Sequence, residues 1–343
     1  MALIEKQSLP KDTLGRGLHD LRISVTDKCN LRCTYCMPAD HYHDSYQFLA
    51  KERLLTFEEI TEVAQAFVEL GVSKLRVTGG EPLLRKDLPT LVRMLRELPG
   101  VEDLALTTNG ILLPIHAEAL REAGLGRITV SLDTLDNEVF SRMSGRGIGV
   151  QSVLEGIAAA HEAGFGPVKI NAVVQRGVND HCTLELAEYF RNSGSVLRFI
   201  EYMDVGTCNG WRKDQVVPSR SLRDQIAERY PLKPLDKNYR GEVAERYAYA
   251  DGAGEIGFIS SVTQPFCGAC TRARLSADGQ VFTCLFASRG TDLRGPLRAG
   301  ASTGELRETV ARIWENRTDR YSEQRAAPHV DGGKRIEMYQ IGG

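Results

Sequence analysis

The sequence of 343 residues contains no long hydrophobic run. Residues 1–20 hold no apolar stretch of signal-peptide length, and no later segment approaches the roughly 20 apolar residues that cross a membrane. An excess of charge of one sign is also missing, because 43 Lys and Arg residues nearly balance 45 Asp and Glu residues. This balance gives no general reason to expect nucleic acid or a membrane as a partner. We therefore expect a cytoplasmic protein whose anion-binding sites are local.

Low-complexity tracts are also missing, and the only internal repeat is a βα unit. Residues 21–26 alternate apolar and polar side chains, which predicts a strand. The residues from Thr56 to Glu59 predict a helix start of the capping-box type. Further strands are predicted at 74–78, 103–108, 127–132, 167–174 and 196–202, and further helices near 87–95, 114–123, 150–164 and 181–192. Six βα units by residue 202 imply a parallel sheet with helices outside it.

Several of these strands are polar on one face. Arg22, Ser24 and Thr26 alternate with apolar residues, and the strands at 74–78 and 167–174 show the same pattern. A complete eightfold barrel packs its interior with bulky apolar layers. The polar faces therefore favour an open barrel that holds a substrate, with an open twisted sheet as the alternative.

A change of pattern follows the last βα unit. From about 203 to 254 the sequence is polar and contains prolines, and we place a domain boundary near 235. Short strands are predicted beyond it at 255–262, 271–276 and 280–286, with an Asp278-Gly279 hairpin turn, and a helix at 302–318. The predicted domains are therefore 1–235, a partial barrel, and 236–343, a smaller α+β domain.

Disulfides are not expected, although the chain has eight cysteines. Three clustered thiols leave one unpaired, and nothing else indicates an oxidising compartment. Six of the cysteines form two triads and two stand alone: Cys29, Cys33 and Cys36; Cys267, Cys270 and Cys284; and the single Cys182 and Cys208.

Each triad lacks an obvious fourth thiol. A [4Fe-4S] cluster usually takes four thiolates, so three leave one iron open to a ligand that is not protein. Zinc is the alternative, because a tetrahedral zinc site closes with a fourth ligand. His41 or His43 would supply that ligand at the first triad. The Cys-x2-Cys pair of the second triad is a common zinc half-site, which His329 or Cys208 would complete.

The first triad, in Cys-Asn-Leu-Arg-Cys-Thr-Tyr-Cys, resembles the motif of the radical S-adenosylmethionine (SAM) superfamily. The resemblance implies a [4Fe-4S] cluster whose open iron is chelated by SAM, and an incomplete (βα)6 TIM-type barrel with this cluster at the carboxyl ends of the strands. SAM would be cleaved there to a 5′-deoxyadenosyl radical. The positions that match SAM contacts are Tyr35 on adenine, Gly80 and Glu81 in Gly-Gly-Glu-Pro, Ser131 and Met203.

Both triads together are similar to the GTP 3′,8-cyclases of molybdenum cofactor biosynthesis, as are Glu-Tyr-Met-Asp-Val-Gly and Cys-Gly-Ala-Cys-Thr-Arg-Ala-Arg-Leu-Ser. The resemblance implies a second [4Fe-4S] cluster whose open iron binds the guanine of GTP. The radical would take H3′ of GTP, and C3′ would attack C8 to give (8S)-3′,8-cyclo-7,8-dihydroguanosine 5′-triphosphate. A triphosphate of about four negative charges needs several cations. The matching GTP positions are Arg22, Arg76, Thr107, Lys169, Arg272, Ala273 and Arg274.

The chain ends on Gly342 and Gly343, as this family does, which implies a tail that enters the active site and acts on the radical step. Glycine lets bare backbone approach a substrate or cluster closely. Arg22 is assigned a further role in the reduction of the cyclised radical. The implied partners are GTP as substrate, an electron donor, the downstream cyclic pyranopterin monophosphate synthase and a second copy of the chain in a homodimer.

Two other functions are considered. A radical SAM enzyme that modifies a peptide also carries auxiliary cysteine clusters in a C-terminal extension, usually with more than three cysteines. A non-catalytic iron–sulfur or zinc sensor is the second alternative. A sensor has no need of the Gly-Gly-Glu-Pro segment that holds the methionyl group of SAM.

Overall fold

The structure of the protein is a computed structural model, which describes residues 9–239, 241–325 and 335–342. Its strands are β1 Asp20–Ser24, β2 Lys74–Thr78, β3 Asp103–Thr108, β4 Arg127–Ser131, β5 Val168–Val174, β6 Ser195–Glu201, β7 Leu232–Leu235, β8 Glu245–Tyr249, β9 Glu255–Ile259, β10 Arg272–Leu275, β11 Gln280–Phe282 and β12 Thr291–Asp292. Its helices are α1 Phe57–Val68, α2 Leu88–Arg96, α3 Leu113–Glu122, α4 Asn137–Ser144, α5 Gln151–Glu162, α6 Thr183–Phe190, α7 Ser219–Arg229, α8 Arg294–Arg298, α9 Thr303–Glu315, α10 Tyr321–Gln324 and α11 Met338–Ile341.

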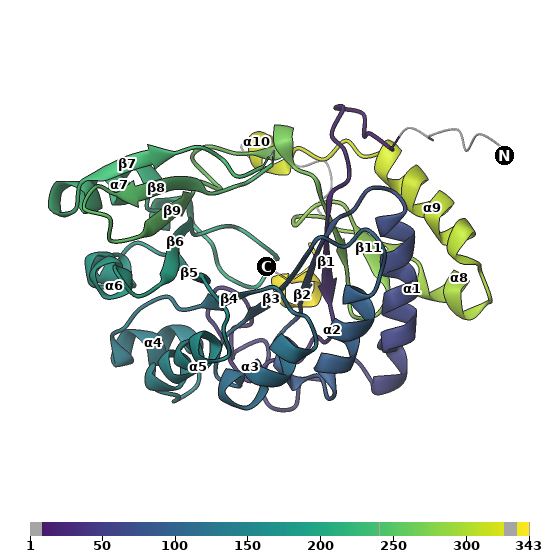
Figure 1. The fold of residues 1–343 in the computed structure, drawn as a ribbon, viewed down its shortest axis with the longest axis horizontal. Helices are drawn as coiled ribbons and strands as arrows, with labels where there is room; N and C mark the ends of the chain where they lie inside the picture. The colour runs from purple at the N-terminus through teal and green to yellow at the C-terminus, as the bar shows by residue number, and fades with distance from the viewer. Residues whose placement is uncertain (1–8, 240, 326–334, 343) are drawn as a thin grey trace.

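The described strands form one curved sheet in the order β12-β11-β10-β1-β2-β3-β4-β5-β6-β9-β8-β7. The run from β10 to β9 is parallel throughout, and the outer strands on both sides are antiparallel. Helices α1 to α6 cover the outer side of the sheet, as Figure 1 shows, and α11 lies inside its curve. The prediction of a parallel α/β sheet with helices outside it is confirmed (Figure 1).

The helices form where the sequence predicts them for local physical reasons. The side-chain oxygen of Thr56 accepts a hydrogen bond from the Glu59 amide, and the Glu59 carboxylate accepts one from the Thr56 amide, so the capping box is present. The apolar face of α1 is buried, with Phe67 fully inaccessible. A side chain of this size contributes about 1.5–3 kcal/mol when it is fully buried.

The sheet separates an apolar side from a polar one. Leu21 and Ile23 of β1 are fully buried in the main hydrophobic core, beneath the helices. Arg22, between them, points to the opposite side, because successive side chains of a strand alternate between the two faces. The inner face of the sheet is therefore available for a polar site.

The C-terminal strands do not form a separate sheet. β10 adds to β1 and β9 adds to β6, so segments after residue 254 extend the N-terminal sheet at both sides. The polar, proline-containing region from 203 to 254, in which the sequence predicts no helix or strand, contains α7 and the β7–β8 hairpin. Its order comes from tertiary pairing, since β8 is held against β9. The boundary near 235 stays a prediction.

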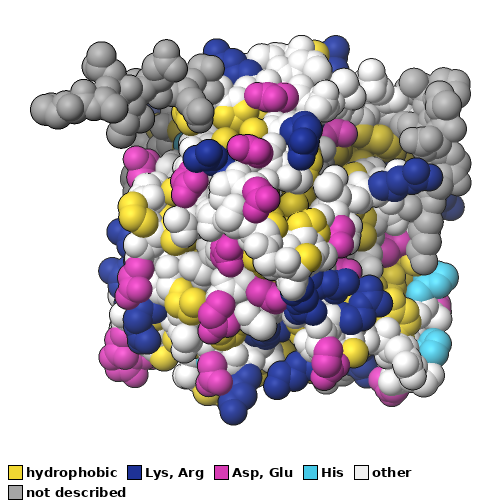
Figure 2. Space-filling model, turned by 90° about the vertical axis from the view of Figure 1, so that its right-hand side faces the viewer, with side chains coloured by type: hydrophobic (Ala, Val, Ile, Leu, Met, Phe, Trp, Pro, Cys, Tyr) yellow, Lys and Arg dark blue, Asp and Glu magenta, His cyan; other side chains and the backbone are white. Residues whose placement is uncertain are grey.

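The outer surface carries both signs of charge. Figure 2 shows basic and acidic side chains interspersed over one face of the molecule, with hydrophobic side chains in small groups between them. This distribution agrees with the near balance of charges in the sequence. Among the described residues, no helix is long and apolar enough to span a membrane.

Candidate active site

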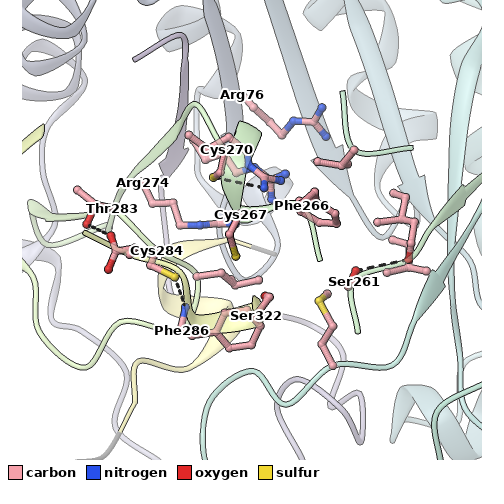
Figure 3. A pocket seen from close by; sticks show the side chains of 18 of the residues that line it. Arg76, Ser261, Phe266, Cys267, Cys270, Arg274, Thr283, Cys284, Phe286 and Ser322 are labelled. Atoms are coloured by element: carbon pink, nitrogen blue, oxygen red, sulfur yellow. Dashed lines mark hydrogen bonds between the residues drawn. The ribbon is translucent and has the colours of Figure 1, made fainter. Parts of the chain in front are cut away.

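A cavity opens on the polar face of the sheet. Figure 3 shows the thiols of the second triad on one of its walls, together with Arg76 and Arg274. It is lined by Arg22, Arg76, Asn171, Ile200, Met203, Val243, Ile259, Ser261, Phe266, Cys267, Cys270, Arg272, Arg274, Thr283, Cys284, Leu285, Phe286, Arg317, Asp319 and Ser322. Strands from both halves of the chain therefore contribute to one cavity.

Three arginines stand side by side across neighbouring strands. Arg22 is in register with Arg274 on β10 and with Arg76 on β2. Like charges placed directly opposite each other in a sheet are destabilising. Burial, followed by repulsion from Arg274, holds the pKa of Arg22 well below its ordinary value. The chain thus keeps an unfavourable concentration of positive charge at this place.

Repulsion between like charges also acts on Arg274 and on Lys169, which is not among the residues that line the cavity. Burial lowers the pKa of Arg274 to about 9, with repulsion from Arg272 adding to the shift. Burial lowers the pKa of Lys169 to about 7, and Arg198 and Arg127 lower it further through their charge. Arginine stays protonated at neutral pH, so these shifts report how strongly the cavity favours an anion.

Four of the seven GTP positions named from the sequence line the cavity, namely Arg22, Arg76, Arg272 and Arg274. Thr107 lies next to them, because its hydroxyl accepts a hydrogen bond from Arg76 at 3.0 Å. Lys169 is paired with Thr129 of β4.

Ala273 differs from the other GTP positions. It is 1% exposed and belongs to the apolar core, in register with Leu21. Any contact of Ala273 with a ligand in the cavity would therefore come from its backbone.

In the second triad the surroundings favour the thiolate form at Cys270, whereas burial raises the pKa of Cys284 to about 12, with the charge of Asp319 adding to the shift. Burial alone would raise the pKa of Cys270, but the charges of Arg272 and Arg317 outweigh it and lower the pKa to about 6. Arg272 Nη2 donates to Cys270 Sγ at 3.4 Å, and the Phe286 amide donates to Cys284 Sγ at 3.5 Å. Hydrogen bonds to the sulfur atoms help to set the reduction potential of an iron–sulfur cluster. The residues therefore fit a cluster held by Cys267, Cys270 and Cys284.

The first triad lies on the loop that follows β1. The amides of Cys36 and Met37 donate to the Cys33 carbonyl at 3.0 and 2.8 Å, which closes a turn around the last two cysteines. The Leu31 amide donates to Cys29 Sγ at 3.4 Å. Burial raises the pKa of Cys29 to about 11, with the charge of Glu81 adding to the shift. A coordinating metal deprotonates a thiol outright, so these residues also fit a cluster.

Arg32 holds this loop together, and the sequence reasoning missed it. Its Nε donates to the Tyr42 carbonyl at 2.7 Å, and its Nη1 donates to the carbonyls of Cys29 and Leu31, each at 2.8 Å. Arg32 is only 6% exposed. A charged residue between two cysteines gives no sequence signal of burial, because such residues are usually solvated.

A site for a single metal ion is not formed by the described residues, since no group of three or more His, Cys, Asp or Glu side chains surrounds one point. In a [4Fe-4S] cluster each thiolate binds a different iron, so the three sulfur atoms do not have to surround one point. His41 and His43 are exposed. Cys208, suggested for the second triad, packs instead against the Met37, Tyr42 and Tyr339 cluster, and the Tyr42 hydroxyl donates to its sulfur at 3.9 Å. His329 lies outside the described residues.

The Gly-Gly-Glu-Pro segment is packed against the first cysteine loop. A side chain on Gly80 would collide with the Lys28 carbonyl, and one on Gly79, where φ is +150°, would meet the Thr26 carbonyl at 2.6 Å. Both positions therefore require glycine. The Gly80 amide donates to the Thr26 carbonyl and the Glu81 amide to the Lys28 carbonyl, each at 2.8 Å.

Glu81 is fully buried, and both of its carboxylate oxygens are used within the chain. They accept hydrogen bonds from the Leu83 amide at 3.0 Å, the Thr108 hydroxyl at 2.8 Å and the Asn109 amide at 2.8 Å. Burial nevertheless raises its pKa to about 7. The Glu81 side chain therefore fixes the turn.

Tyr35 and Ser131 lie near a buried carboxylate that the sequence reasoning missed. The Tyr35 hydroxyl donates to Asp133 at 2.7 Å, and the Val173 amide donates to the other oxygen of Asp133 at 2.8 Å. Asp133 follows Ser131 by two residues in Val-Ser-Leu-Asp, and an acidic residue directly after a strand was the available signal. Met203, the remaining SAM position, lines the cavity.

The C-terminal tail is docked inside the curve of the sheet. Gly342 is buried with φ at +67°, and a side chain there would collide with Thr78. The Gly342 carbonyl accepts a hydrogen bond from Arg274. Tyr339 is 3% exposed and contacts Tyr42 edge to face. Gly343 lies outside the described residues.

The carboxylate of Glu337 also anchors the tail. It accepts hydrogen bonds from the amide and the hydroxyl of Thr207 at 2.9 and 2.8 Å.

Comparisons with known proteins agree with this geometry. Residues 23–190 match the family model described as Radical SAM superfamily, and residues 195–323 match Molybdenum Cofactor Synthesis C. The chain is 57% identical to a GTP 3′,8-cyclase of Acidothermus cellulolyticus, with 92% of this chain and 88% of the relative covered. It is 56% identical to that of Xanthomonas axonopodis pv. citri, covering 97% and 98%. It is 46% identical to that of Staphylococcus haemolyticus, again covering 97% and 98%.

Among solved structures, Streptococcus suis SuiB bound to S-adenosylmethionine is similar with a TM-score of 0.60 at 16% identity. The match covers 84% of this chain and 68% of SuiB. At this identity the likeness concerns the fold alone.

Proposed function

The chain belongs to the GTP 3′,8-cyclase family of radical SAM enzymes. We propose that its two cysteine triads hold two [4Fe-4S] clusters, of which the first binds SAM and the second binds GTP. The reaction is the cyclisation of GTP in molybdenum cofactor biosynthesis. When bound, the first cluster and SAM supply the 5′-deoxyadenosyl radical that takes H3′ of GTP. C3′ then bonds to C8, and one electron and one proton complete (8S)-3′,8-cyclo-7,8-dihydroguanosine 5′-triphosphate.

The concentration of arginine beside the second triad carries this proposal. Arg22, Arg76 and Arg274 stand in one row across three strands, and Arg272 adjoins Cys270. Burying these charges without an anion is unfavourable, and a triphosphate of about four negative charges removes the penalty. We assign Arg22, Arg76, Lys169, Arg272 and Arg274 to the phosphates, with the Thr107 hydroxyl and the Ala273 backbone in smaller contacts.

The SAM side is assigned to residues near the first triad. Cys29, Cys33 and Cys36 bind the first cluster, and the backbone of Gly80 and Glu81 binds the methionyl group. Tyr35 packs on adenine, and Ser131 and Met203 complete the site. The glycines that bring this backbone against the cysteine loop support the assignment.

The second triad and the tail are assigned to the substrate. Cys267, Cys270 and Cys284 hold the cluster that binds guanine, because they line the cavity with the arginines. Gly342 and Gly343 act on the radical step, and the docking of Gly342 beside Arg274 supports this role. Arg22 serves in the reduction of the cyclised radical.

Partners follow from the reaction. The electron that cleaves SAM must come from a donor, and the cyclised nucleotide must pass to a cyclic pyranopterin monophosphate synthase. A homodimer and a cytoplasmic location complete the proposal. The peptide-modifying and sensor alternatives are not favoured, because relatives of 46% to 57% identity over nearly the whole chain are named GTP 3′,8-cyclase.

Anaerobic reconstitution of the full chain tests the proposal. Two clusters predict about eight irons and eight sulfides per chain, SAM cleavage that rises when GTP is added, and the cyclised nucleotide as product. Tightly bound zinc, or SAM cleavage that does not depend on GTP and yields no cyclised nucleotide, would disprove it.

A further inference from the structure

Three buried charged residues form a cluster beside the second cysteine loop, and one of them, Arg317, also lines the cavity. The side chains of Arg16, Asp12 and Arg317 are 2%, 0% and 2% exposed. Arg16 Nε lies 2.6 Å from Asp12 Oδ2, and Arg317 Nη1 lies 3.3 Å from the same oxygen. None of these residues lies within either cysteine motif or within Gly-Gly-Glu-Pro.

Both guanidinium groups bind the backbone of the Cys-x2-Cys turn. Arg16 Nη1 donates to the Cys267 carbonyl at 2.7 Å, although the two residues are 251 positions apart. Arg317 Nη1 donates to the Cys270 carbonyl at 2.8 Å. The two cysteines at the ends of the turn are thus held by separate arginines, and a single carboxylate joins those arginines.

The cluster is itself tightly fixed. The Trp314 indole donates to the Arg16 carbonyl at 2.9 Å, and the Arg317 guanidinium lies over the Trp314 ring at 4.5 Å. Arg317 Nε contacts the Asp319 carboxylate at 3.3 Å. Asp12 Oδ1 accepts the Arg16 amide at 2.9 Å. Each of the three charged side chains therefore has at least one charged partner.

Stability alone does not explain this cluster. Desolvation of buried ions offsets much of their attraction, and apolar residues of similar volume are often as stable. Arg16 Nη2 is buried without a hydrogen-bond partner among the described residues. This guanidinium therefore keeps a donor for an acceptor that the described chain does not supply, such as a sulfur of a cluster.

We propose that Arg16 and Arg317, joined by Asp12, are positioning residues for the second iron–sulfur cluster. They fix the carbonyls of Cys267 and Cys270, so that the two thiols face the cavity before the cluster is assembled. The proposal rests on the assignment of a cluster to this triad. Its consequence is that the second cluster depends on the N-terminal segment around residues 12–16, far from it in sequence.

Arg16→Lys and Arg317→Lys test the proposal in the full chain, because lysine keeps the charge but cannot bind two acceptors through a planar fork. Iron is expected to fall from about eight to about four per chain. The spectroscopic signal of the second cluster should be lost, while SAM cleavage without GTP stays within about twofold. Arg312→Lys, an exposed position on the same helix as Trp314, is the matched control and should keep all the iron.

Two further variants keep the outcomes separate. Cys270→Ala should lose the second cluster; if it keeps about eight irons, the cluster assignment itself is wrong. If the lysine variants fail to fold, Asp12→Asn decides, since its amide oxygen still caps the Arg16 amide without the charge. Folded Arg16→Lys, Arg317→Lys or Asp12→Asn protein with full iron and an unchanged second-cluster spectrum would overturn the proposal.

Discussion

The first cysteine loop is organised by a residue of its own, whereas the second is organised by residues from distant parts of the chain. Arg32 lies between Cys29 and Cys33 and binds the backbone on both sides of itself. Arg16 and Arg317 reach the second loop from the N-terminal segment and from the end of α9. The first site is therefore encoded locally, and the second exists only in the folded chain.

The two loops also differ in the charge around them. Burial raises the pKa of Cys33 well above its usual value, and the neighbouring thiols and Asp133 add to the shift. At the second loop, burial raises the pKa of Cys270 but the nearby arginines outweigh it. Acidic surroundings suit SAM, which carries a sulfonium and an ammonium group, and basic surroundings suit a triphosphate. The arginines around Cys270 thus match the triphosphate assigned to the second site, although Asp319 acts in the opposite direction on Cys284.

The largest effect is expected from the cysteines, and it separates the two loops. Cys29→Ala, Cys33→Ala or Cys36→Ala should reduce SAM cleavage to background, because a coordinating thiolate of the first cluster is lost. Cys267→Ala, Cys270→Ala or Cys284→Ala should instead abolish cyclisation while some deoxyadenosine still forms. Deoxyadenosine and cyclised product, measured together, check this. Normal product from any second-triad variant would contradict the division.

Gly342→Ala is expected to suppress cyclisation at least tenfold. An alanine at this positive φ destabilises the docked tail by about 1–2 kcal/mol. Its methyl group would also collide with Thr78. Both clusters should assemble, and GTP affinity should stay within a few-fold, because the change acts on the tail. Gly300→Ala, also at positive φ but in open space, is the control for backbone strain. Full product from Gly342→Ala with intact clusters would show that the tail is not needed.

Arg272→Ala and Arg274→Ala should each weaken the binding of GTP far more than the binding of SAM. A charge-assisted hydrogen bond contributes about 1.5–3 kcal/mol, which corresponds to roughly ten- to a hundredfold in affinity. Equilibrium binding of both ligands measures this, with the exposed Arg212→Ala as control. GTP affinity that stays unchanged in both variants would remove these residues from the substrate site.

GTP affinity should fall about tenfold from pH 7 to pH 9 through Lys169. Its pKa is lowered to about 7 in the free protein by burial and by neighbouring arginines. A bound triphosphate favours the protonated amine and therefore raises this pKa. Binding of GTP then takes up a proton, and because protons become scarcer as pH rises, GTP affinity falls. Calorimetry in buffers of different ionisation enthalpy measures the proton. Lys169→Arg should lose both the uptake and this part of the pH dependence; identical profiles would exclude Lys169.

The smallest effect is expected at the first loop, from Tyr35→Phe. The change removes a hydrogen bond to Asp133 of 2.7 Å but keeps the ring. A net loss of about 0.5–1.5 kcal/mol predicts a two- to tenfold weaker SAM affinity and little change for GTP. Tyr189→Phe, at an exposed tyrosine on α6, is the control. A drop in GTP affinity instead would place Tyr35 on the substrate side.

Local patterns were enough to predict the βα order and most of its elements. β2 and β3 occupy the residues expected, and the capping box of α1 is present, because alternation and capping act over a few neighbouring residues. α4, α7 and the β7–β8 hairpin were missed. α7 buries only Ser219, Leu222 and Ile226, so its sequence pattern is weak, and the hairpin is held through its pairing with β9.

The sequence by itself determined the two cysteine triads, their spacing and the polar face of the strands. Only the tertiary structure decided that β10 pairs with β1 and β9 pairs with β6, so that both strands join the same sheet. That arrangement brings Arg274 beside Arg22, Gly342 beside Thr78, and Arg16 onto the second cysteine loop. Spacing within a motif is fixed by covalent geometry over a few residues. Contacts across about 250 positions depend on the packing of the whole chain, which no local pattern records.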